Sequence, residues 1–286
     1  MDARATGTIL DKIVADRRVR LAEDRARRPE ETLRALIAQA PPPIDFARRL
    51  REGRRATPAG ARLRIIGEVK RASPSKGLFD ADLDAAKQAR AYAVAGVAAI
   101  SVLTEPDHFR GSLADLEAVR AAFGSDADRP AILRKEFIFD PYQVVEARAA
   151  GADALLLIVM MLEPAALASL LAQTEALGMQ ALVEVHDEAE MRAALDAGAT
   201  ILGVNNRDLR TFAEDLGTTE RVAALVPDGV TLVAESAIRH AADARRMAAC
   251  GAHALLVGEA LVTTGDIAAK ARELMLVDDV PSEVRA

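Results

Sequence analysis

The 286-residue sequence predicts an α/β fold: a (β/α)8 TIM barrel over residues 61–286, preceded by a helical extension over residues 1–60. Three observations lead to this prediction. A glycine-containing phrase occurs four times, four further strand-like segments lie between its copies, and a segment of helical composition follows each strand. Eight such units close a barrel of about 250 residues with extensions. We therefore expect a single domain.

The extension before the first strand is expected to be helical and to pack on the barrel. Residues 9–26 (ILDKIVADRRVRLAEDRA) and 31–40 (ETLRALIAQA) have helical composition, and PPP at 41–43 interrupts the run. So short a segment would build a poor core alone, so a separate domain is the weaker alternative.

The first set of strands follows the repeated phrase. Each time an Ala-rich segment stops at a glycine, which most easily takes the left-handed conformation that ends a helix, and aliphatic residues begin soon after. The four copies are AGVAAISVL at 95–103, AGADALLLI at 150–158, AGATILGVN at 197–205 and CGAHALLVG at 250–258.

The second set of strands lies between these phrases. Its members are RIIGEVK at 64–70, AILRKEF at 131–137, QALVEVH at 180–186 and TLVAESA at 231–237. The competing architecture is an open, doubly wound sheet. No glycine-rich dinucleotide fingerprint supports that alternative.

Composition argues against several classes of function. A net charge of −6 disfavours a nucleic-acid surface. The basic clusters at 17–20, 25–28 and 48–55 alternate with acidic residues at helical spacing, and we interpret them as solvated helix faces, with RNA or DNA binding as the alternative. Cys250 is the single cysteine, so neither a disulfide framework nor a thiolate metal cluster is expected.

The sequence predicts no membrane segment. The longest apolar run, residues 154–162, is shorter than the roughly 18 residues that a spanning helix needs. The N-terminus has no apolar signal core, and its early aspartates argue against a transit peptide. We expect a cytoplasmic protein.

Charged residues end the odd-numbered strands of the predicted barrel. Alternate strands share layers in such barrels, and the chemistry lies at the C-terminal mouth, so these residues should meet there: Lys70, Lys135, Glu184 and Glu235. Glu68 would lie one layer below Lys70 and Phe137 on the rim. Such a grouping suits acid/base catalysis or Schiff-base chemistry by a lysine. For residues 64–70 alone, an edge strand with a solvated face is the alternative.

The last two units and the first loop carry candidates for binding a phosphate group. In this fold, the loops after strands 7 and 8 and a nearby helix N-terminus often bind phosphate. The candidates are Ser73, Ser236, Gly258 and Glu259, and ordinary turns are the alternative.

Amides and an arginine end the sixth strand, in GVNNRDL at 203–209. Asn205 can donate and accept hydrogen bonds toward a polyhydroxy chain, while Arg207 could either meet an anion or tie the rim together. The four histidines are scattered and show no ligand spacing, so no metal is implied: His108, His186, His240 and His253.

At these residues the chain resembles indole-3-glycerol phosphate synthase, an enzyme of tryptophan biosynthesis. The resemblance runs through the whole barrel in ordered motifs, and residues 9–18 resemble the family's N-terminal helix. The matching segments are GEVKRASPSKG at 67–77, SVLTEPDHFRGS at 101–112, residues 133–158, LVEVHDE at 182–188, GVNNRDL at 203–209, AESAI at 234–238 and LLVGEALV at 255–262.

The resemblance implies a catalytic set. It implies that 1-(2-carboxyphenylamino)-1-deoxyribulose 5-phosphate closes to indole-3-glycerol phosphate with loss of CO2 and water. Lys135 would be the general acid, helped by Glu184. Lys70 would pair with the anthranilate carboxylate and take part in dehydration, with Glu68 as proton acceptor or as the group that orients Lys70. Asn205 would hold substrate hydroxyls or the lysines.

The resemblance also implies binding residues. Glu235 would share the role of Asn205, and Arg207 remains a candidate for the rim. Phe109 and Phe137 would line the anthranilate ring. The phosphate would bind to Ser73, Ser236 and Gly258, with Glu259 nearby. No cofactor is implied. Ala237 stands where the family typically has glycine; a positive φ there would cost about 1 kcal/mol and weaken phosphate binding at most.

Rival functions remain open at this point. One rival is another phosphate-binding barrel, either a sugar-phosphate isomerase or a Schiff-base aldolase that uses Lys135 or Lys70. A second rival is a non-catalytic paralogue that binds the substrate. The expected partner is a small phosphorylated substrate, with other tryptophan-pathway enzymes as further candidates. The chain ends soon after the eighth unit, so we expect a single-function polypeptide.

Overall fold

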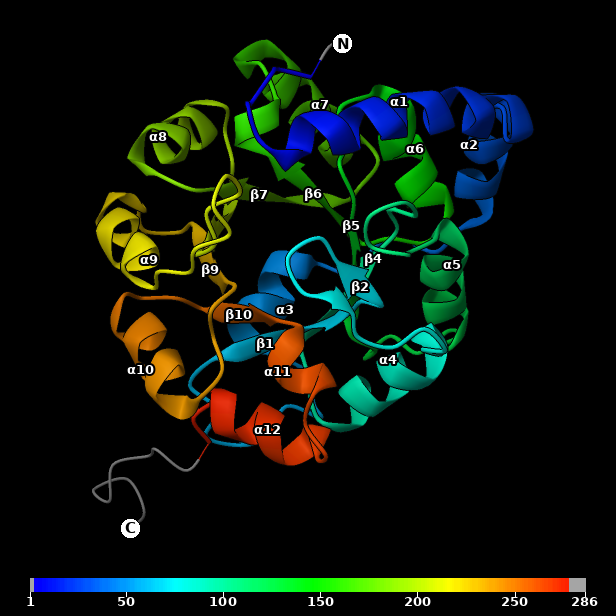
Figure 1. The fold of residues 1–286 in the computed structure, drawn as a ribbon. Coiled ribbons are helices and arrows are strands. Elements are labelled where there is room, and N and C mark those ends of the chain that lie inside the picture. The colour runs from blue at the N-terminus through cyan, green and yellow to red at the C-terminus, as the bar shows by residue number, and fades with distance from the viewer. Residues whose placement is uncertain (1–2, 278–286) are drawn as a thin grey trace.

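The computed structural model describes residues 3–277, and within them eight parallel strands form a closed barrel (Figure 1). Each strand pairs with the next along the chain, and the last pairs with the first. The strands are β1 (Arg64–Val69), β4 (Ala99–Leu103), β5 (Ala131–Lys135), β6 (Ala154–Ile158), β7 (Gln180–Val185), β8 (Ile201–Asn205), β9 (Thr231–Glu235) and β10 (Ala254–Val257). The predicted barrel is confirmed, and the open sheet is excluded.

An outer ring of helices covers the barrel, as Figure 1 shows. Its members are α4 (Ala85–Val94), α5 (Leu113–Ala121), α6 (Pro141–Ala149), α7 (Pro164–Ala176), α8 (Glu188–Asp196), α9 (Gly217–Val222), α10 (Ala241–Ala249) and α12 (Ile267–Leu274). Because the strands are covered on both faces, their residues are buried almost throughout. None of the helices described is long and apolar enough to cross a membrane.

Local sequence explains where many of these helices begin and end. Five of them start at a side chain that accepts a hydrogen bond from a backbone N–H of the first turn, namely Asp84, Ser112, Asp140, Asp187 and Asp266. The glycines of the repeated phrase all have the left-handed φ that ends a helix: 84° at Gly96, 93° at Gly151, 90° at Gly198 and 82° at Gly251.

Shorter elements lie at the C-terminal mouth. The first loop contains a hairpin of β2 (Ala72–Ser73) and β3 (Gly77–Leu78), which sequence reasoning treated only as a loop. A one-turn helix, α11 (Glu259–Val262), follows β10. Both elements place their residues around the opening of the barrel.

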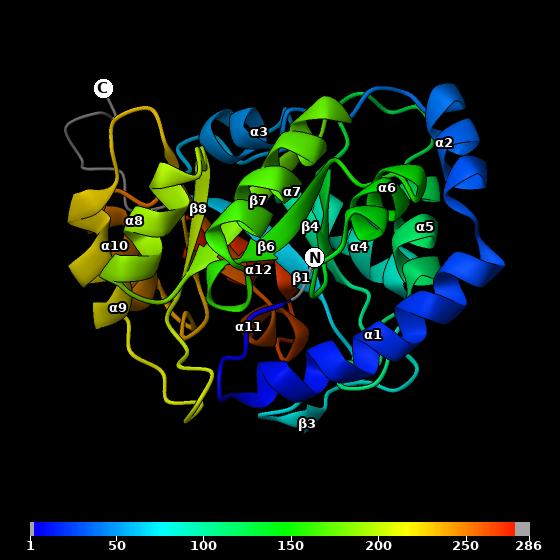
Figure 2. The same cartoon turned by 90° about the horizontal axis from the view of Figure 1, so that it is seen from above.

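The N-terminal segment folds into α1 (Ile9–Arg27), α2 (Glu30–Gln39) and α3 (Phe46–Glu52), which lie at different ends of the barrel (Figure 2). Helix α1 runs past the C-terminal mouth, and α2 packs beside α6. Helix α3 lies at the strand starts, where Ala47 N donates to Gln180 Oε1 (2.9 Å) and Arg51 Nε donates to Thr231 Oγ1 (2.8 Å).

Ion pairs fasten α1 to the second and third βα units. They join His108 to Asp16, Arg20 to Asp107, Arg28 to Glu117 and Arg25 to Asp140. One residue corrects the interpretation of the basic clusters as solvated faces. Arg17 is only 3% exposed, because its guanidinium lies 3.5 Å from Glu136 and 3.4 Å from Asp24 beneath the helix.

A buried carboxylate ties the N-terminal segment to the barrel. Asp153 is 1% exposed and accepts hydrogen bonds from Ile44 N (2.8 Å) and Ile132 N (2.7 Å). Its two oxygens also pair with Arg129, at 2.5 and 2.8 Å. One side chain thus joins the segment before α3 to the start of β5.

Asp153→Ala should lower the free energy of unfolding by about 3 kcal/mol, because it leaves the Arg129 charge and two backbone donors buried without their acceptor. Urea unfolding followed by far-UV circular dichroism measures this change. Asp228→Ala, at an exposed position, is the control and should stay within about 0.5 kcal/mol of wild type. If both substitutions lower the free energy of unfolding equally, Asp153 does not stabilise the contact between the N-terminal segment and the barrel.

Candidate active site

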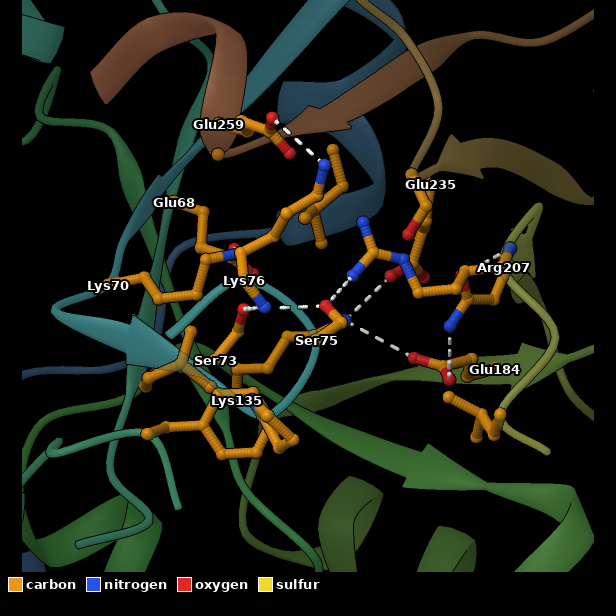
Figure 3. A pocket seen from close by; sticks show the side chains of 18 of the residues that line it. Glu68, Lys70, Ser73, Ser75, Lys76, Lys135, Glu184, Arg207, Glu235 and Glu259 are labelled. Carbon is orange, nitrogen blue, oxygen red and sulfur yellow. Dashed lines mark hydrogen bonds and ion pairs between the residues drawn. The ribbon is translucent and has the colours of Figure 1, made fainter. Parts of the chain in front are cut away.

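A pocket at the C-terminal mouth brings together the charged side chains that end the odd-numbered strands (Figure 3). Lys135 lies at its centre: its Nζ is 2.6 Å from Glu235 Oε2 and 3.2 Å from Glu184 Oε2. The three side chains come from the ends of β5, β9 and β7, three non-adjacent strands. Barrel closure therefore places one ammonium between two carboxylates.

A second charged pair comes from β1 and the residue after it. Glu68 is 4% exposed, and its carboxylate forms an ion pair with Lys70. The Lys70 ammonium also lies 5.6 Å from the centre of the Phe79 ring. Gly258 leaves room for this pair, since a Cβ there would lie 2.5 Å from Glu68 Oε1 and 3.1 Å from Lys70 Nζ.

Glu235 occupies the most constrained place in the pocket. It is 1% exposed, and within residues 3–277 its Oε1 has no hydrogen-bond partner. A side chain at Gly203, on the neighbouring β8, would overlap with that oxygen. The glycine thus keeps open the space that the carboxylate fills.

Burial and charge shift the pKa values of the central group in opposite directions. Burial opposes the charge of Lys135, but Glu235, Glu184 and Glu68 outweigh it and hold the lysine pKa above its usual range. Burial likewise opposes the charge of Glu184, yet Lys135 and His186 hold the pKa of that carboxyl well below its usual range. Burial and the nearby Glu184 raise the pKa of Glu235 to about 7, although Lys135 acts against them.

The resulting charge state is set by these shifts. Lys135 is an ammonium at neutral pH and can act as a proton donor, while Glu184 is a carboxylate. Glu235 titrates near neutrality. Protons can move between Lys135 and its two glutamates, and between Lys70 and Glu68, because each pair is in direct contact.

The end of β8 contributes an amide and an arginine with different roles. Asn205 Nδ2 donates to Glu184 Oε1 at 3.0 Å, and Asn205 Oδ1 accepts from the Arg207 N–H at 3.1 Å. The Arg207 guanidinium binds Ser75 in the β2–β3 hairpin and Glu214 in the loop after β8. These contacts are those of a residue that ties the rim together, and a role for Arg207 in meeting an anion stays a prediction.

The residues predicted to bind phosphate all line this pocket, and Ala237 lines it beside them: Ser73, Ser236, Gly258 and Glu259. Ser236 and Ala237 have positive φ, 64° and 62°, so their backbone turns sharply after β9. Glu259 lies 3.6 Å from Lys76 Nζ, a lysine of the hairpin that sequence reasoning did not select. Lys76 therefore adds a cation to this part of the pocket (Figure 3).

Apolar side chains form another part of the pocket lining. The rings of Phe109 and Phe137 have centroids 5.8 Å apart and are tilted by 38°. Buried carboxylates fix both backbones, since Glu105 Oε2 accepts from the Phe109 N–H and Glu136 Oε1 accepts from the Phe137 N–H, each at 3.0 Å. Leu10 of α1 completes this part of the lining.

Sequence reasoning missed several residues of this site. Helix α1 lines the mouth with Ile9, Leu10 and Ile13, but no sequence pattern indicates where an extension docks. His186 contacts Glu184, with Nε2 3.4 Å from Oε1. Strand alternation did not identify it, because β7 ends at Val185 and His186 follows the strand. Among the residues described, no group of His, Cys, Asp and Glu could hold a metal ion.

Comparisons with known proteins identify the family of this chain. Residues 10–274 match the family described as indole-3-glycerol phosphate synthase. An indole-3-glycerol phosphate synthase from Roseiflexus sp. (strain RS-1) is 52% identical over 270 residues, which are 93% of this chain and 98% of the relative. A multifunctional tryptophan biosynthesis protein from Schizosaccharomyces pombe is 47% identical over 277 residues, which are 95% of this chain and 35% of that protein.

Solved structures share the fold. A crystal structure of 3-hexulose-6-phosphate synthase from Salmonella typhimurium aligns with a TM-score of 0.57 and 17% identity, covering 75% of this chain and 98% of that one. At that identity the likeness shows the barrel alone.

Ala237→Gly should raise the free energy of unfolding by about 0.5–1 kcal/mol, because the left-handed conformation at φ 62° costs an alanine more than a glycine. Chemical denaturation measures the change. Ala193→Gly, in the interior of α8, should instead lower it by about 1 kcal/mol. If both substitutions change the free energy of unfolding in the same direction, the left-handed backbone at Ala237 does not carry the cost argued above.

Glu235→Gln should make stability less dependent on pH. The folded-state pKa of about 7 exceeds the ordinary 4.5, so between these values the folded state binds more protons than the unfolded state. Stability from this group is therefore present at low pH and is lost as pH rises through about 7. Relative to wild type, the variant should gain stability between pH 5 and pH 8, as measured by urea unfolding.

The matched control for this titration is Glu31→Gln, at an exposed position on α2. Its stability difference from wild type should be the same at both pH values. If the stability difference between Glu235→Gln and wild type is also the same at both pH values, Glu235 keeps an ordinary pKa in the folded protein.

Proposed function

The chain belongs to the indole-3-glycerol phosphate synthase family, and we propose from this that its barrel mouth closes the indole ring. The substrate is 1-(2-carboxyphenylamino)-1-deoxyribulose 5-phosphate, and the products are indole-3-glycerol phosphate, CO2 and water. The observation that carries the proposal is Lys135, an ammonium held at hydrogen-bond distance between Glu184 and Glu235.

Ring closure needs an acid at the ribulose carbonyl. The substrate's amine nitrogen pushes electrons into the ring carbon that carries the carboxylate, and that carbon attacks the carbonyl carbon. Lys135 Nζ gives its proton to the carbonyl oxygen as the new C–C bond forms, so a hydroxyl group results. Glu184 and Asn205 orient the lysine and the hydroxyl, and Glu235 keeps the ammonium charged until the proton is needed.

Decarboxylation and dehydration restore the aromatic system. Lys70 holds the anthranilate carboxylate until the C–C bond to it breaks and CO2 leaves. The hydroxyl group then leaves as water with a proton from Lys70, while Glu68 removes a proton from the adjacent carbon. Because Glu68 and Lys70 are in direct contact, the proton that Glu68 takes can return to Lys70.

The rest of the pocket fixes the two ends of the substrate. The rings of Phe109 and Phe137 pack against the anthranilate ring. At the other end, backbone N–H groups at Ser236 and Gly258, the Ser73 hydroxyl and the Lys76 ammonium surround the phosphate. Glu259 holds Lys76 there. The two ends set the distance at which the carbonyl meets Lys135.

The charge state of Lys135 argues against the aldolase alternative. A Schiff base requires a neutral amine, whereas three carboxyl groups hold the pKa of this lysine above its usual range. The full acid/base set argues against a non-catalytic paralogue, because binding alone does not require Lys135 between two glutamates.

Partners beyond the substrate follow from one relative. The S. pombe protein that matches this chain is named as multifunctional in tryptophan biosynthesis, and the match covers 35% of its length. We therefore expect other tryptophan-pathway enzymes to be partners of this chain, and we expect its principal ligand to be a small phosphorylated molecule.

The test mixes the purified protein with the carboxyphenylamino-deoxyribulose phosphate, without added metal or cofactor, and follows indole fluorescence. Lys135→Met should lower kcat by about 10²- to 10⁴-fold, the usual contribution of a general acid, while substrate binding persists. Lys87→Met, at an exposed position on α4, is the control and should keep wild-type kcat.

The outcomes separate the rivals. A Lys135→Met variant with wild-type turnover would remove Lys135 from the mechanism. An adduct trapped by borohydride would favour the Schiff-base aldolase. Tight binding of the substrate by the wild type without indole formation would identify a non-catalytic paralogue.

A further inference from the structure

His186 lies on the far side of Glu184 from Lys135 and connects it to helix α8. Its Nε2 is 3.4 Å from Glu184 Oε1, and its Nδ1 is 3.0 Å from Glu190 Oε2. The same Glu190 oxygen accepts the His186 backbone N–H at 2.8 Å, which holds the Glu190 carboxylate beside the ring. A row of contacts therefore runs from Glu190 through His186 and Glu184 to Lys135, in which His186 Nε2 is at ion-pair distance from Glu184 and makes no hydrogen bond within residues 3–277.

The two ends of this row face different spaces. Glu184 lines the pocket at the barrel mouth, whereas His186 lines a separate outer pocket between α8 and α9. Charged residues from both helices border the outer pocket: Asp187, Glu188, Arg192 and Arg221. His186 is thus positioned between the catalytic pocket and the outer surface of the barrel.

The proposed reaction consumes one proton per turnover. The substrate enters with an ionised carboxylate, and that group leaves as neutral CO2, so the products carry one negative charge fewer. Lys70 recovers its proton from Glu68, but the proton that Lys135 gives to the carbonyl oxygen leaves with the water. Lys135 must therefore be reprotonated from solvent before the next turnover.

We propose that His186, anchored by Glu190, delivers this proton from the outer pocket to Lys135 through Glu184. This inference rests on the proposed function. His186 does not touch the substrate, so it is a positioning and proton-transfer residue rather than a catalytic one.

The transfer balances at each atom. After Lys135 has become a neutral amine, the Nε2–H bond of the His186 imidazolium breaks and an O–H bond forms on Glu184. The imidazole keeps its other proton at Nδ1, hydrogen-bonded to Glu190. The proton arrives on Oε1, which faces His186, so the carboxyl group turns to bring it to the Lys135 side; it then passes to Nζ, which lies 3.2 Å from Oε2, and Glu184 becomes a carboxylate again. Because Nε2 is buried in the resting position, the imidazole ring turns toward the outer pocket before water there returns a proton to that nitrogen and restores the imidazolium.

The direction of transfer is downhill. Burial lowers the pKa of His186, but the carboxylates of Glu184 and Glu190 outweigh burial and raise it to about 10. The acceptor, Lys135, has a pKa above its usual range because Glu235, Glu184 and Glu68 surround it. Overall transfer from His186 to the neutral lysine is therefore downhill. The step onto Glu184 is uphill, because Lys135 and His186 hold the pKa of that carboxyl below its usual range, and loss of the Lys135 charge removes the larger of these two effects.

The experiment compares His186→Gln with the wild type in indole formation between pH 6 and pH 9.5. Glutamine can keep the contacts with both glutamates but cannot become a cation. We expect kcat to fall at least tenfold at pH 9, with KM changed less than twofold and a larger D2O effect on kcat. In His186→Ala, added imidazole should restore part of the lost kcat.

The second pair of variants tests the anchor on α8. Glu190→Gln should shift the pH at which His186 titrates downward, measured by NMR of histidine labelled with 15N in the imidazole ring. Asp196→Asn is the matched control, since it also replaces a carboxylate by an amide on the same helix but lies at an exposed position outside the outer pocket. It should leave both kcat and the His186 titration unchanged.

Two results would overturn the proposal in distinguishable ways. Wild-type kcat and an unchanged pH profile in His186→Gln, while the wild type forms indole, would remove His186 from proton delivery and leave the proposed function intact. A wild type that forms no indole would overturn the proposed function and this route together. If His186→Gln does not fold, a Glu190→Gln variant with unaltered His186 titration and kcat would overturn the route.

Discussion

The whole site depends on one buried ion cluster, the Lys135 ammonium between the carboxyl groups of Glu184 and Glu235. Burying such charges separately would be costly, and removing one partner of a buried pair leaves an uncompensated charge. The cluster is possible because barrel closure brings the ends of β5, β7 and β9 to one mouth. The same closure requires gaps beside the carboxyl groups, which Gly203 and Gly258 provide. Packing and charge therefore constrain each other.

The cluster also explains how an acidic protein handles an anionic substrate. The chain carries a net charge of −6, so long-range attraction does not favour a molecule with a carboxylate and a phosphate. Attraction is local instead, from Lys70 and Lys135 in the mouth and Lys76 on the hairpin. Each of these lysines is held by a glutamate of the same pocket, so the cations stay in place before the substrate arrives.

Much of this architecture could be predicted from the sequence, because the repeat specifies it. The glycine phrase located four strands, and equivalent strand ends then placed Lys70, Lys135, Glu184 and Glu235 at one mouth. What could not be predicted depends on contacts between segments far apart in the chain. No local pattern shows that α1 docks over the mouth, that Arg17 is buried against Glu136, or that Arg207 binds Ser75. Ala237 was recognised as unusual, but its positive φ became evident only in the structure.

A closed barrel restricts how protons reach its interior, and this restriction gives His186 its significance. Neighbouring strands are hydrogen-bonded around the whole ring, so water has no path between them. The mouth is the obvious opening, but in the proposed reaction the substrate fills it while Lys135 is being consumed as an acid. The remaining path runs over the rim, where β7 ends and its last side chains face two different pockets. Glu184 faces inward there and His186 faces outward, so a proton can cross the wall of the barrel while the mouth stays occupied.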